Sequence, residues 1–95
     1  MSEEIPLRRK SVYYSGHVQG VGFRYTAQTL ARRFDVTGFV RNLSDGRVEL
    51  VAEGRPAELE ALLRLVRSEL YDRIRDVSID TQPATGEFNG FRIRH

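Results

Sequence analysis

With 95 residues, the chain has room for one compact domain. Hydrophobic residues make up 40% and charged residues 29%, which excludes an intrinsically disordered protein. The absence of cysteine excludes disulfides, thiolate metal sites and thiol nucleophiles, and 15 basic against 13 acidic residues give a net charge of only +2. No apolar run approaches the roughly 18 residues of a membrane span, and no signal-like apolar segment follows the N-terminus, so we expect a cytoplasmic protein.

The first elements are a strand and a glycine-rich loop. Residues 1–10 carry two acidic and three basic side chains. Residues 1–7 are expected to be frayed, which leaves residues 8–95 for the domain. β-Branched and aromatic residues at 11–15 predict a strand. The loop that follows is predicted from three glycines, which allow positive φ angles or the close approach of a ligand: Gly16, Gly20 and Gly22.

A helix and a hairpin are predicted next. The helix covers residues 23–34, because apolar residues recur there with helical spacing at Phe23, Ala27, Leu30, Ala31 and Phe34. Two strands, at residues 38–43 and 47–51, lie on either side of Ser44-Asp45-Gly46, since Asp-Gly at this spacing is a hairpin-turn signal.

The last third of the chain completes the fold. A second helix is predicted to begin at Pro56, with an apolar face that consists of Leu59, Leu62, Leu63, Val66 and Leu70. A polar connection at 71–76 leads to an alternating strand at 77–81, a loop at 82–90 and a short edge strand at 91–94. This order predicts an α+β fold, with both helices on one face of a five-stranded, mostly antiparallel sheet and the other face open to solvent.

Residues 16–24, Gly-His-Val-Gln-Gly-Val-Gly-Phe-Arg, have the features of an anion site. Backbone N–H groups at a helix N-terminus are unpaired and the helix dipole is positive there, so a dianion binds favourably. No Ser, Thr, Asp or Asn directly precedes Phe23 as a cap, and Arg24 can add charge-assisted hydrogen bonds. The spacing matches neither a Walker loop nor a dinucleotide fingerprint, so we expect a phosphate group rather than a nucleotide.

Two segments resemble the signatures of the acylphosphatase family. The first is residues 16–24; the second is residues 38–48, Gly-Phe-Val-Arg-Asn-Leu-Ser-Asp-Gly-Arg-Val, with Gly54 closing it. Residues 91–94 also look like the family's last strand. The resemblance implies a ferredoxin-like α/β sandwich, in agreement with the element order. It further implies hydrolysis of the carboxyl–phosphate bond of an acyl phosphate to a carboxylate and inorganic phosphate.

The resemblance also implies the roles of individual residues. Arg24 would bind the phosphoryl group, and Asn42 would orient the attacking water. A phosphate cradle would be formed by the main-chain amides of His17, Val18, Gln19, Gly20, Val21 and Gly22. Because the conjugate acid of a carboxylate leaving group has a pKa of roughly 4, no general acid is required. We expect no metal, no cofactor and no covalent enzyme intermediate.

Several residues near these signatures have simpler interpretations. Some family members carry hydroxyl side chains where this chain has Leu43 and Arg47, so the chain lacks those hydroxyls. His17 is interpreted as a main-chain donor with an exposed ring, and Asp45 as a turn residue. His95 has no partners in the sequence with metal-ligand spacing, so it is not expected to bind a metal.

Two other functions were weighed. Lys10 is the only lysine among the bases, and this arginine bias suggests a small nucleic-acid-binding module, but acids are interspersed and no RNP-type aromatic motif follows a strand. An acylphosphatase-like domain could also bind acyl or carbamoyl phosphate for a larger maturation enzyme. We expect instead a monomer whose partners are an acyl phosphate and inorganic phosphate, with no nucleic acid and no membrane. Acetyl, carbamoyl and 1,3-bisphosphoglycerate phosphates are all candidate substrates.

Overall fold

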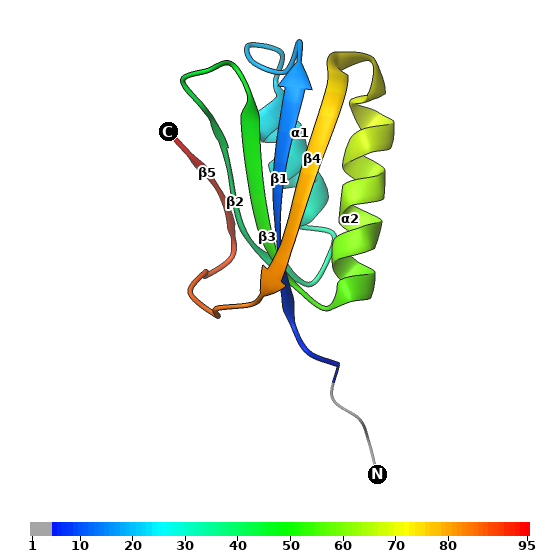
Figure 1. The fold of residues 1–95 in the computed structure, drawn as a ribbon, viewed down its shortest axis with the longest axis vertical. Helices are drawn as coiled ribbons and strands as arrows, with labels where there is room; N and C mark the ends of the chain where they lie inside the picture. Colours follow the sequence, from blue (N-terminus) through cyan, green and yellow to red (C-terminus); the bar gives the residue numbers. More distant parts are fainter. Residues whose placement is uncertain (1–4) are drawn as a thin grey trace.

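The computed structural model describes residues 5–95, and within this range a five-stranded open sheet carries both α-helices on one side (Figure 1). The elements, in chain order, are β1 (Arg8–Gly16), α1 (Phe23–Ala31), β2 (Val36–Asn42), β3 (Val48–Gly54), α2 (Pro56–Glu69), the 3-10 helix η1 (Tyr71–Arg73), β4 (Ile74–Pro83) and β5 (Phe91–Arg94). The predicted α+β architecture is confirmed. Residues 1–4 of the segment expected to be frayed lie outside the described residues.

The strand order of the sheet is β4-β1-β3-β2-β5. β1 pairs antiparallel with β3 and β4, and β2 pairs antiparallel with β3 but parallel with β5. The sheet is therefore mostly antiparallel, and β5 lies at an edge, as predicted. This topology makes β1, β2 and β5 run in the same direction, so their C-terminal ends meet at one end of the sheet.

The main core lies between the sheet and the two helices. Strand residues such as Val12, Val40 and Leu50 are fully buried against the helices, and the ring of Tyr14 packs on Phe23 with centroids 5.0 Å apart. α2 buries Leu59, Leu62 and Val66 completely, and Leu63 packs against the same core. The helical faces read from the sequence are thus the faces that pack on the sheet.

The helix-free face of the sheet is less open than the sequence suggests. Phe39 lies on this face and is only 7% exposed. Phe88 from the β4–β5 connection packs against it with centroids 5.6 Å apart, and the Arg94 guanidinium carbon lies 3.9 Å from the centre of the Phe39 ring. The connection between β4 and β5 therefore covers part of the face that was expected to contact solvent.

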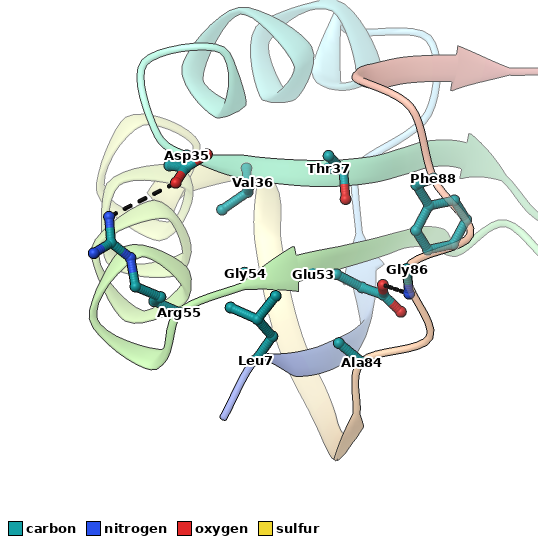
Figure 2. A pocket seen from close by; sticks show the side chains of 10 residues that line it. All are labelled: Leu7, Asp35, Val36, Thr37, Glu53, Gly54, Arg55, Ala84, Gly86 and Phe88. Atoms are coloured by element: carbon teal, nitrogen blue, oxygen red, sulfur yellow. Dashed lines mark hydrogen bonds and ion pairs between the residues drawn. The ribbon is translucent and has the colours of Figure 1, made fainter. Parts of the chain in front are cut away.

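Glu53 anchors the same connection at the far end of β3 (Figure 2). Its carboxylate is 4% exposed and accepts hydrogen bonds from the Thr85 and Gly86 amides, both at 2.9 Å, and from Arg9 Nε at 2.7 Å. Burial alone would raise the pKa of Glu53, but these hydrogen bonds outweigh it and lower the pKa to about 2. Glu53 also lines a pocket of about 310 Å³ between the start of β2 and the β4–β5 connection.

Some element boundaries differ from the sequence prediction. β1 and β4 are longer than predicted because they pair from Arg8↔Pro83 onward, and main-chain pairing does not require apolar alternation. α1 ends at Ala31 rather than Phe34, and a tight turn follows in which the Phe34 amide donates to the Ala31 carbonyl at 3.1 Å. Residues predicted as a polar connection form η1 and the start of β4. Across residues 5–95, none of the helices is long and apolar enough to cross a membrane.

Candidate active site

The C-terminal ends of β1, β2 and β5 surround a pocket of about 240 Å³. Arg24 and Asn42, the two residues assigned to catalysis, both line it. The complete lining consists of Val18, Gly20, Gly22, Phe23, Arg24, Tyr25, Asn42, Ile93 and His95. Two residues that lie 18 positions apart in the sequence therefore share one site.

The loop between β1 and α1 presents unpaired amides to this pocket. Within residues 5–95, no backbone or side-chain acceptor takes a hydrogen bond from the amides of residues 17–22. α1 begins at Phe23 without a side-chain cap, and the capping position is Gly22 in the left-handed conformation, with φ of +78°. A β-carbon would be strained at this φ, so glycine permits the bend that leads the loop into the helix. Unpaired amides and the positive end of the helix dipole together favour an anion.

Arg24 is placed by the first turn of α1. Its side chain is half-buried, and Nη1 lies 3.3 Å from Nδ1 of His95. No carboxylate of residues 5–95 comes within 4.0 Å of its guanidinium. Its positive charge is therefore not neutralised by an ion pair, which leaves it available to an anionic ligand.

Asn42 is the last residue of β2 and lines the same pocket. Its Oδ1 atom is buried, and no donor among the described residues hydrogen-bonds to it. A buried carbonyl oxygen without a partner costs roughly 1–3 kcal/mol, so such groups usually have a hydrogen-bonding partner. An acceptor of this kind is suited to hold a water molecule at the pocket.

Gln19 has a second role beyond the main-chain one assigned to it. Its Nε2 donates to the carbonyl oxygens of Leu43 at 2.8 Å and Arg47 at 2.9 Å. The side chain thereby joins the loop that carries the amides to the hairpin that follows Asn42. Because the acceptors are main-chain carbonyls, this connection does not require hydroxyl side chains at positions 43 and 47.

The hairpin itself is closed by local contacts. Asp45 accepts hydrogen bonds from the Arg47 amide at 3.1 Å and from Arg47 Nε at 2.8 Å. These two bonds, the amide first, lower the pKa of Asp45. Asp45 thus acts as a turn residue, as interpreted from the sequence.

Of the six residues assigned to the cradle, His17, Gln19 and Val21 are not part of the pocket lining. The ring of His17 is exposed, as expected, and Val21 packs against the core. Val18 does line the pocket, and its side chain is fully buried. Their main-chain amides still belong to the loop, so these positions can shape the cradle through the backbone.

Sequence reasoning gave no site role to four pocket residues: Phe23, Tyr25, Ile93 and His95. His95 was considered only as a metal ligand. The alternation of Phe91 and Ile93 places position 95 on the same face of the sheet, and this pattern could have indicated that His95 points toward the helices. What the sequence did not reveal is that β5 pairs with β2, which brings His95 next to Asn42.

Comparison with known proteins agrees with the geometry. The acylphosphatase family model matches residues 10–93. A protein from Salinibacter ruber named acylphosphatase is 47% identical over 88 residues, covering 92% of this chain and 93% of that protein. An acylphosphatase from an Anaeromyxobacter species is 44% identical over 90 residues, covering 94% and 97%.

Solved structures give the same result. The crystal structure of acylphosphatase from Bacillus subtilis matches with a TM-score of 0.84 and 30% identity, covering 93% of this chain and 99% of that one. Full-length HypF in a phosphate- and nucleotide-bound form matches with a TM-score of 0.80 and 25% identity; 99% of this chain is covered, but only 13% of HypF. Fold, signatures and nearly full-length similarity agree, and the chain belongs to the acylphosphatase family.

Proposed function

We propose that this protein hydrolyses acyl phosphates with three groups: the unpaired loop amides, Arg24 and Asn42. The observation that carries the proposal is their arrangement around one pocket of about 240 Å³. The phosphoryl group of the substrate would lie between the loop and Arg24, with the attacking water held by Asn42. Family membership supports the reaction, and the geometry supports these assignments.

The phosphoryl group would be bound by the backbone and by one charge. Amides of residues 17–22 donate to its oxygens, and the Arg24 guanidinium adds charge-assisted hydrogen bonds in a fixed fork. Phosphoryl transfer passes through a loose transition state with charge spread over the equatorial oxygens. Donors that are already in position stabilise this charge without reorganising during the reaction, which is the main contribution expected of the protein.

The nucleophile would be a water molecule bound to Asn42. A water O–H donates to the buried Oδ1, and the lone pair on the water oxygen then faces the phosphorus. The new P–O bond forms as the bond between phosphorus and the acyl oxygen breaks, and the water proton passes to a phosphate oxygen. The bond electrons leave with the carboxylate, which is stable without protonation, so no general acid is needed.

Hydrolysis of benzoyl phosphate in the presence of EDTA tests this mechanism. We expect wild-type protein to turn over, and Arg24→Ala and Asn42→Ala to lose at least about 100-fold in kcat/KM, as expected when a transition-state contact is removed. Arg33→Ala and Asn89→Ala are matched controls, since both side chains are exposed and outside the pocket. Folded variants that keep full activity would refute the assigned roles.

We also infer that the protein acts as a cytoplasmic monomer on small molecules. Few large apolar side chains are exposed among residues 5–95: Ile5 and Leu7 come from the segment before β1, and Tyr25, Tyr71 and Ile79 come from α1, η1 and β4. Light scattering after size-exclusion chromatography tests the monomer. Salt-dependent RNA binding would instead favour the nucleic-acid module, and phosphate binding without turnover would favour a domain that serves a larger enzyme.

A further inference from the structure

We propose that His95 is a positioning residue that holds the Arg24 guanidinium at the phosphate site. This inference rests on the proposed function of Arg24 and goes beyond it, because the mechanism above gives His95 no role. The two side chains line the same pocket, and Arg24 Nη1 lies 3.3 Å from His95 Nδ1. They come from positions 71 residues apart, so the contact depends on the fold rather than on local sequence.

The pairing of β5 with β2 brings His95 to the pocket. In this parallel pair Val40 lies opposite Ile93 and Arg41 opposite Arg94, so His95 continues the register beside Asn42. Side chains alternate along a strand, so position 95 shares the face of Ile93, which packs against the core under the helices. α1 contacts both strands on that face, and its first turn carries Arg24.

The chemistry of the two groups fixes the direction of the hydrogen bond. A guanidinium has donors and no acceptor, so the Arg24 Nη1–H group donates and His95 Nδ1 accepts. The imidazole must then be neutral, with its proton on Nε2. Arg24 has five N–H donors, so this bond uses one and leaves four for a phosphoryl group.

A neutral partner orients Arg24 without cancelling its charge. Six other arginines among residues 5–95 do pair with carboxylates: Arg9, Arg41, Arg47, Arg55, Arg73 and Arg75. A carboxylate at the position of His95 would compete with the phosphate for the guanidinium. An imidazole nitrogen instead restricts the conformations of a long side chain, and this reduces the entropy lost when phosphate binds.

Two variants of His95 separate this role from simple packing. His95→Leu keeps a similar volume but removes the acceptor, whereas His95→Asn keeps an acceptor oxygen near the position of Nδ1. We expect His95→Leu to weaken inorganic phosphate binding, followed by NMR titration, by about fivefold, and to raise KM for benzoyl phosphate equally with kcat unchanged. His95→Asn is expected to restore both values to within about twofold.

A second comparison tests whether His95 acts through Arg24. In an Arg24→Ala background, His95→Leu should cause no further loss of phosphate affinity. Arg92→Leu, in the strand β5 that leads to His95 and exposed, is the matched control and should bind phosphate as the wild type does. A further loss in the Arg24→Ala background, or wild-type affinity in His95→Leu, would overturn the positioning role. Phosphate binding without turnover would refute the proposed function alone, because the titration requires no reaction.

Discussion

Replacement of Glu53 by Gln is expected to cost about 3 kcal/mol of stability at pH 7. The pKa of Glu53 falls from an ordinary value of 4.5 to about 2 in the folded protein, and each pKa unit corresponds to about 1.4 kcal/mol. Gln keeps the size of the side chain but removes the charge and turns an NH₂ group toward donors from Arg9, Thr85 and Gly86. Chemical denaturation of the two proteins measures the difference directly.

The pH dependence of this difference is the stronger test. Because the folded pKa of Glu53 is lowered, its contribution is complete above pH 4.5 and is lost as pH falls toward 2. The difference in the free energy of unfolding between wild type and Glu53→Gln should therefore fall from about 3 kcal/mol at pH 7 to about 1.5 kcal/mol at pH 3. Glu87→Gln, in the same connection but 55% exposed, should cost less than about 1 kcal/mol. A gap that is the same at both pH values would refute the assignment of a strongly lowered pKa.

Further predictions concern the sheet and the loop. A β-carbon at Gly38 would lie 1.8 Å from the Val51 carbonyl oxygen at a φ of +148°, so Gly38→Ala should lose at least about 3 kcal/mol in urea denaturation. Gly46→Ala, at a φ of +95° but with open space, should lose only about 1–2 kcal/mol, and equal losses would contradict the steric argument. Gln19→Leu removes both hydrogen bonds to the hairpin and should raise KM for benzoyl phosphate about tenfold, while exposed Gln82→Leu should not; unchanged kinetics would show that the loop keeps its shape unaided.

Most of the fold could be predicted from local sequence patterns. Apolar spacing identified the faces of α1 and α2, and the Asp45-Gly46 turn separated β2 from β3, because these features depend on residues close together in sequence. Phe39 shows the limit of such patterns. They could not show that Phe88 covers Phe39 on the helix-free face. That contact depends on the path of the β4–β5 connection, which contains no periodic pattern.

The candidate site, like the fold, could be predicted from the sequence only in part. Arg24 and Asn42 stand in motifs specific enough to be found from the sequence, and the pocket that they share follows from the strand directions. The side-chain bonds of Gln19 and the contact of His95 were not found, because each joins positions that meet only after the strands pair. Residue type predicts which contacts are chemically possible, whereas strand register decides which of them form.

The outer position of β4 has a consequence for self-association. An edge strand offers unpaired N–H and C=O groups to a second chain, and this strand is ten residues long. If two copies paired antiparallel about Ser78, Asp76 of one would lie opposite Asp80 of the other, and both side chains are exposed. Like charges facing each other across strands oppose such pairing, and Pro83 lacks the amide needed to extend it. In this register, the exposed acids of β4 thus oppose growth into an extended intermolecular sheet.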